Sequence, residues 1–74
     1  MNCADEIDLG RSAYWSGDFL KARRHFGRAH AACRDDKALH RVAHGALCRV
    51  AWRLGDIPEA LKQFALFILT PLFN

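Results

Sequence analysis

Two histidines and a cysteine recur at every fourth position in the segment 39–56: His40, His44 and Cys48. Residues four apart are neighbours on one face of an α-helix, so these side chains would form a single row. Imidazole nitrogens and thiolate sulfurs are ligands for Zn²⁺ and related transition metals. The row is therefore either a metal-binding face or part of the packed core, and the spacing alone leaves both interpretations open.

A third histidine, His30, precedes a short turn centred near Asp35. His30 lies five residues before that turn and His40 five after it, so an antiparallel helical hairpin would place them at the same height. Three imidazoles with a free fourth position suit Zn²⁺, and Cu or Ni are also compatible. One expectation is therefore a metal site whose ligands are His30, His40, His44 and Cys48, with Cys33 also close to the cluster.

The alternative for each histidine is a half-buried side chain that is hydrogen-bonded to a carboxylate or a backbone carbonyl. Three imidazoles that meet would repel one another when protonated, which would destabilise the fold in acid. His25 falls outside this face, and we expect it on the solvent side.

Enzyme activity is not expected. The sequence has no Ser/His/Asp arrangement, no glycine-rich phosphate loop and no paired-carboxylate site, so we assign no catalytic and no cofactor-binding residues. Asp5, Glu6 and Asp8 are explained by the favourable position of acidic groups at the start of a helix.

The chain has 74 residues, of which 51% are hydrophobic, and a formal net charge of +3. We expect a single folded domain over residues 1–74, of a size that usually needs a metal, a disulfide or a partner subunit. This modest charge does not favour nucleic-acid binding, which would depend on the arginines Arg23, Arg24, Arg28, Arg41, Arg49 and Arg53.

Turn and capping signals divide the chain into four predicted helices, about 4–16, 19–33, 37–54 and 57–69. Gly17-Asp18 and Gly55-Asp56 mark two breaks, Asp18 can cap the second helix, and Asp35 or Asp36 can cap the third. Asp56, Pro58 and Glu59 form a helix start with a capping box, and Pro71 is expected to end the last helix. The predicted fold is all-α.

The cysteines Cys3, Cys33 and Cys48 are odd in number and show no disulfide-framework spacing. Because no signal-peptide pattern is evident, we expect reduced thiols in a cytoplasmic protein. The apolar run 64–73 is too short to span a membrane, so no membrane contact is expected.

The two halves of the chain align with each other. Residues 13–22 (AYWSGDFLKA) match residues 51–60 (AWRLGDIPEA), and Phe26 then matches Phe64. This pattern resembles the tetratricopeptide repeat, although the copies are 38 residues apart and that repeat is about 34 long. The resemblance implies two antiparallel helical hairpins whose concave face accepts a peptide or protein.

A second resemblance rests on Arg28-Ala29-His30, the histidines 40 and 44, Arg49, Trp52-Arg53, Asp56, Glu59 and Gln63. This series is similar to the bacterial domain of unknown function 3703 family. The sequence departs from that family at Gly45, where the family tends to have Trp, and it lacks a Gly/Asn-rich tail. The resemblance implies a helical fold and draws attention to the histidines; it brings no established activity.

The predicted fourth helix is apolar on every side around residues 64–69, and two hairpins cannot enclose it. We expect a homodimer through Phe64, Phe67, Ile68 and Phe73. The expected function is therefore non-enzymatic: a small module for protein–protein interaction or self-association, or alternatively a metal-binding or metal-responsive protein that uses the histidine cluster.

Overall fold

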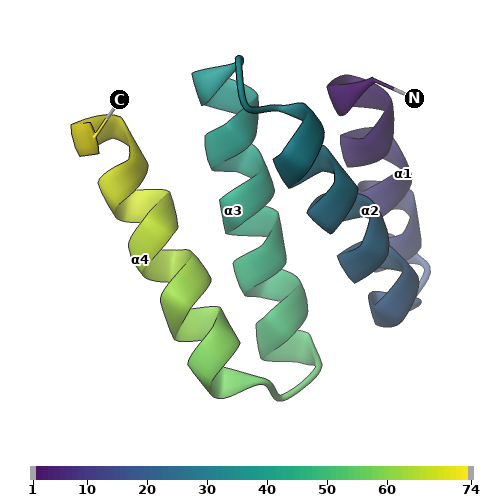
Figure 1. The fold of residues 1–74 in the computed structure, drawn as a ribbon. Helices are drawn as coiled ribbons and strands as arrows, with labels where there is room; N and C mark the ends of the chain where they lie inside the picture. Colours follow the sequence, from purple (N-terminus) through teal and green to yellow (C-terminus); the bar gives the residue numbers. More distant parts are fainter. Residues whose placement is uncertain (1, 74) are drawn as a thin grey trace.

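Four α-helices make up the fold: α1 (Cys3–Trp15), α2 (Phe19–Ala32), α3 (Lys37–Arg53) and α4 (Ile57–Phe73). The structure is a computed structural model that describes residues 2–73, with side chains described as far as residue 69. The helices follow one another in a flattened row in which α1 pairs with α2 and α3 with α4 (Figure 1). The predicted all-α fold with antiparallel hairpins is confirmed.

Each helix begins at a side-chain cap. Asn2, Asp18, Asp36 and Asp56 each accept a hydrogen bond from the backbone N–H three residues later, which satisfies one of the free donors of a helix start. The sequence predicted the caps Asp18 and Asp56, and for the third helix it left Asp35 and Asp36 as alternatives, of which Asp36 is the cap. The capping box at Glu59 was a wrong prediction, because the Asp56 N–H donates to the Ala51 carbonyl instead.

The last helix extends to Phe73, so the prediction that Pro71 ends it near residue 69 is wrong. Proline has no N–H, and in a helix it leaves the carbonyl four residues earlier without its donor. That carbonyl belongs to Phe67, and it accepts a hydrogen bond from Arg41 Nε at 3.0 Å. Arg41 of α3 thus replaces the donor that Pro71 lacks, and the helix continues.

Small side chains fill most of the interface between neighbouring helices. Ala22, Ala29, Ala43 and Val50 are fully buried, so the helix backbones can approach closely. The main large core side chain is Phe26, whose ring lies directly against Gly10 of α1. The core is therefore shallow and depends on glycine and alanine at the contact points.

A disulfide joins Cys3 at the start of α1 to Cys33, the residue that caps the end of α2. The expectation of three reduced thiols is wrong for this pair, because the first helical hairpin brings together two cysteines 30 positions apart in the sequence. Cys48 is a free, half-buried thiol. Among the described residues, no helix is long and apolar enough to cross a membrane.

The glycines provide a matched test of this packing. A Cβ at residue 10 would lie 2.5 Å from the Phe26 ring, whereas a Cβ at residue 27 would meet no atom within 4 Å. We expect Gly10→Ala to lower the free energy of unfolding by about 1–3 kcal/mol through overpacking. Gly27→Ala should raise it by up to about 1 kcal/mol through helix propensity. Urea unfolding of both variants measures the difference, and a stabilising Gly10→Ala would contradict this account of the core.

Candidate metal centre

Three histidines meet between α2 and α3. His30 comes from α2, and His40 and His44 come from successive turns of α3; one ring nitrogen from each lies within 4.8 Å of the others. The ring centroids are 4.4–4.7 Å apart, and Nε2 of His30 lies 3.1 Å from Nε2 of His44. The predicted convergence of these three side chains is confirmed.

The hairpin between α2 and α3 creates this arrangement. The turn capped by Asp36 reverses the chain, and Ala29 and Ala43, both without exposed surface, belong to one buried cluster that joins the two helices. Each alanine adjoins a cluster histidine in the sequence. Close backbone approach at these positions therefore holds His30 against His44.

A hydrogen-bond chain from α4 orients His44. Glu59 Oε1 accepts from Gln63 Nε2 at 2.8 Å, and Gln63 Oε1 lies 2.6 Å from His44 Nδ1. A carboxylate only accepts hydrogen bonds, so the Gln63 NH₂ group faces Glu59 and its oxygen faces His44. His44 Nδ1 then donates its N–H to Gln63, and the other ring nitrogen, Nε2, faces His30 in the cluster.

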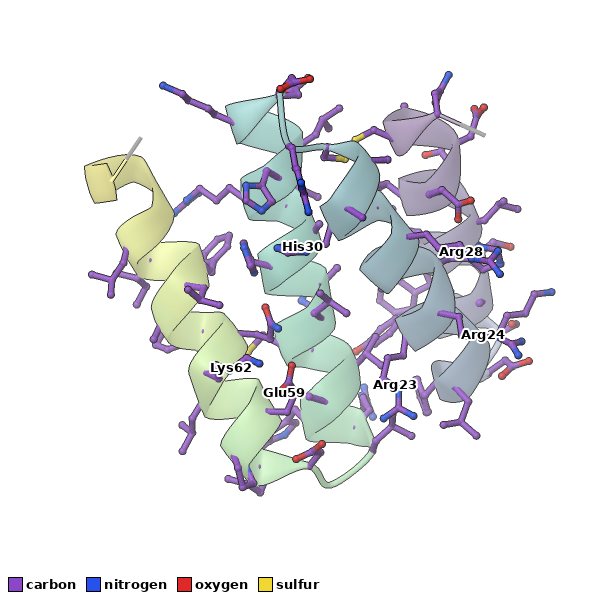
Figure 2. All side chains as sticks on the ribbon, viewed as in Figure 1. Arg23, Arg24, Arg28, His30, Glu59 and Lys62 are labelled. Carbon is purple, nitrogen blue, oxygen red and sulfur yellow. A yellow bond between two sulfur atoms is a disulfide. The ribbon has the colours of Figure 1, made fainter. Side chains whose placement is uncertain are left out.

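The ionised state of Glu59 supports this assignment. The hydrogen bond from Gln63 is the main factor that lowers the pKa of Glu59, and Lys62, at 3.4 Å, and Arg23 lower it further against the opposing effect of burial. Figure 2 labels Glu59 and Lys62, which lie next to each other on α4, and His30 of α2. A carboxylate at the outer end of the chain fixes the direction of the hydrogen bonds.

Two histidines of the cluster, His30 and His40, have lowered pKa values, which favour the neutral form. Burial lowers the pKa of His30, and the neighbouring His44, His40, Arg34 and Lys62 lower it further. Burial, His44 and Arg34 likewise lower the pKa of His40. Because the lone pair that binds a metal exists only on a neutral imidazole, these shifts favour metal ligation at neutral pH.

The cysteines are not brought into this cluster. Cys33 is in the disulfide, and Cys48, which the sequence predicted as a fourth ligand, lines an apolar groove instead. The groove has a volume of about 520 Å³ and is also lined by Gly45 and Arg49. Each of these follows a cluster histidine by five residues, His40 and His44 respectively, which places it roughly 140° further around the helix. The groove therefore lies on the other face of α3.

His25 is a correction to the sequence-based expectation. It does not point into solvent but is half-buried, with Nδ1 2.8 Å from Oε2 of Glu6. Glu6 is itself buried, so its role is to pair α1 with α2 and not only to favour a helix start. The buried partner lies 19 residues away in the sequence, and no local pattern indicates this contact.

Two residues of the site, Gln63 and Glu59, were not predicted as functional from the sequence. Both appear in the series on which the family resemblance rests, and their spacing of four places them on one face of a helix. Those two signals together could have identified them. The missing information was which face of α4 would pack against His44.

The apolar surface of α4 is only partly as expected. Phe64 and Ile68 are exposed, as the predicted dimer surface requires, whereas Phe67 is half-buried beneath the guanidinium of Arg41, whose Cζ lies 4.0 Å from the ring centroid. The Phe73 side chain lies outside the described residues. A Cβ at Gly45 would lie 3.0 Å from the Phe67 ring, so glycine at that position leaves room for Phe67.

The lowered pKa values of His30 and His40 determine how we expect the stability of the metal-free protein to depend on pH. The native pKa values of His30 and His40 lie below the ordinary value of 6.5. At pH values near and below 6.5, the unfolded chain therefore binds more protons than the folded protein does. The free energy of unfolding should therefore fall as the pH drops from 7.5 to 5.5. Urea unfolding after metal chelation measures this, and the double variant His30→Gln/His40→Gln should show a flatter dependence. An equally steep dependence in the variant would assign the effect to other groups.

Comparison with known protein families identifies a match over nearly the whole chain. Residues 2–74 match the family described as Protein of unknown function (DUF3703). No curated protein and no solved structure matches the chain. The matched range contains the positions of the three cluster histidines, Glu59 and Gln63. This chain therefore belongs to the DUF3703 family.

Proposed function

We propose that the protein binds one divalent transition-metal ion, with Zn²⁺ as the best fit, through His30, His40 and His44. The carrying observation is that three ring nitrogens lie within 4.8 Å of one another. A tetrahedral Zn²⁺ with Zn–N bonds of 2.0–2.1 Å holds two imidazole nitrogens about 3.3 Å apart. The His30–His44 pair, at 3.1 Å, is already close to that separation.

The hydrogen-bond chain through Gln63 supports this proposal over a purely structural cluster. Metal-binding histidines usually donate their second ring N–H to an outer oxygen, which fixes the tautomer and the ring orientation. His44 has such a partner in Gln63, backed by Glu59. The competing interpretation is a simple hydrogen bond from His30 to His44, with the Gln63 amide oriented by Glu59.

The donor set also narrows the choice of ion. Three neutral imidazoles without a thiolate suit Zn²⁺, Ni²⁺ or Cu²⁺, and the absence of Cys48 from the cluster removes the preference for softer ions such as Cu(I). Such an ion would tie α2 to α3, the contact that joins the two helical hairpins, so metal binding would stabilise the whole fold.

Isothermal titration with Zn²⁺, on protein stripped of metal, tests the proposal. We expect one Zn²⁺ per chain in the wild type, and loss of binding in His30→Ala and in His40→Ala/His44→Ala. Gln63→Ala should weaken the affinity by about 10–100-fold, as other outer-sphere substitutions do. His25→Gln, a histidine outside the cluster, is the matched control and should bind normally.

Circular dichroism of each variant confirms that the helices persist. If the wild type binds no Zn²⁺, Ni²⁺ or Cu²⁺, or if His30→Ala binds as tightly as the wild type, the three-histidine site is wrong.

A second candidate function is self-association through α4. Ile57, Leu61, Phe64 and Ile68 follow a 4-3-4 spacing that forms one stripe along the helix, and 40%, 62%, 52% and 47% of their respective surfaces are exposed. This is the spacing of the seam between paired helices. The charged residues of α4, Glu59 and Lys62, lie outside the stripe and pair with each other, so a second copy would meet no like charge there.

Sedimentation equilibrium tests this association. The wild type should be a dimer at micromolar concentration, and Leu61→Glu/Phe64→Glu should be a monomer, because buried unpaired carboxylates oppose association. Trp52→Glu changes an exposed apolar residue of α3 outside the stripe and should remain a dimer. A wild type that stays monomeric at high concentration would exclude the dimer.

The broader sequence-based expectations remain proposals. A tetratricopeptide-like peptide or protein partner is supported by the hairpin order and the apolar groove of α3. A cytoplasmic location is a proposal that rests on the sequence alone. The Cys3–Cys33 disulfide argues against it, because disulfides persist mainly in oxidising compartments.

A further inference from the structure

The histidine cluster contains no negative charge to balance a divalent ion. Its three ligands are neutral imidazoles, and no carboxylate or thiolate among the described residues joins them. The hydrogen-bond chain from His44 ends at the carboxylate of Glu59. That carboxylate already accepts a hydrogen bond from Gln63 and forms an ion pair with Lys62. A bound ion would therefore keep its full double charge.

Positive groups of the protein add to this charge. Arg34 acts electrostatically on both His30 and His40, and Lys62 acts on His30. Lys62 is paired with Glu59, whereas the guanidinium of Arg34 has no carboxylate within ion-pair distance among the residues that the structure describes. Arg34 is thus a cation without a counter-ion beside the cluster.

The cluster is open on one side. His44 is buried beneath Gln63, while His30 and His40 are half-buried and Arg34 is exposed. Arg34 follows His30 by four residues, and it stands in the turn that leads to His40. The accessible part of the cluster is therefore formed by His30 and His40, the two histidines on which the exposed Arg34 acts electrostatically.

We propose that the fourth ligand of the metal is a small oxyanion from solution, a carboxylate or a phosphate, whose free oxygens accept hydrogen bonds from the Arg34 guanidinium. This inference rests on the proposed metal site. A guanidinium presents paired N–H donors that match carboxylate and phosphate oxygens, and such charge-assisted bonds are about twice as strong as neutral ones. The anion displaces a metal-bound water and supplies the negative charge that the histidines lack.

Cobalt-loaded protein provides the test, because the visible absorption of Co²⁺ changes when its fourth ligand changes. Acetate and inorganic phosphate are titrated separately at constant ionic strength, which keeps general screening fixed. We expect saturable spectral changes in the wild type with at least one of the two anions. Arg34→Ala should weaken anion binding about tenfold while Co²⁺ affinity stays within about twofold or improves.

Two further variants separate a specific contact from net charge. Arg34→Lys retains the charge but not the paired donors, so it should bind the anion with intermediate affinity. Arg28→Ala removes the same charge from an exposed position of α2 that Figure 2 shows on the side away from His30, and it should bind anions as the wild type does.

The two proposals fail in different ways. If the protein takes up no Co²⁺, both the metal site and this inference are wrong. If Co²⁺ binds at one equivalent but neither anion alters its spectrum, or if Arg28→Ala and Arg34→Ala weaken the anion equally, the metal site stands and the Arg34-assisted oxyanion is wrong.

Discussion

The close approach of α2 to α3 is the contact on which the rest of this small protein depends. The fully buried alanines at positions 29 and 43 allow the two backbones to come together. This contact joins the first helical hairpin to the second. It also brings His30 within hydrogen-bond distance of His44, so the same packing produces both the fold and the candidate site.

The fourth helix contributes in a different way, through polar contacts. Gln63 orients His44 from one side of α4, and the Phe67 carbonyl accepts a hydrogen bond from Arg41 further along. The guanidinium of Arg41 also covers the Phe67 ring. These interactions fix the position of α4 on α3 although much of its apolar surface is exposed, because buried polar groups are satisfied only in one register.

The two faces of α3 have different chemistry. One face carries His40 and His44 under the polar groups of α4, and the other borders the apolar groove with Cys48 and Arg49. A helix with every side partly buried can therefore serve a polar site and an apolar surface at once. The metal site and any partner bound in the groove would be separate functions of one helix.

The sequence by itself determined the number of helices, two of the four caps and the candidate histidines. Those features follow from local chemistry: a side-chain oxygen bonds an N–H three residues away, and the spacing of four sets one face of a helix. Tertiary structure alone decided the Cys3–Cys33 disulfide, the Glu6–His25 pair, the continuation of α4 past Pro71 and the exclusion of Cys48 from the cluster. Each depends on which faces of two helices meet across a turn. That choice is set by the packing of the whole chain, and no local pattern contains it.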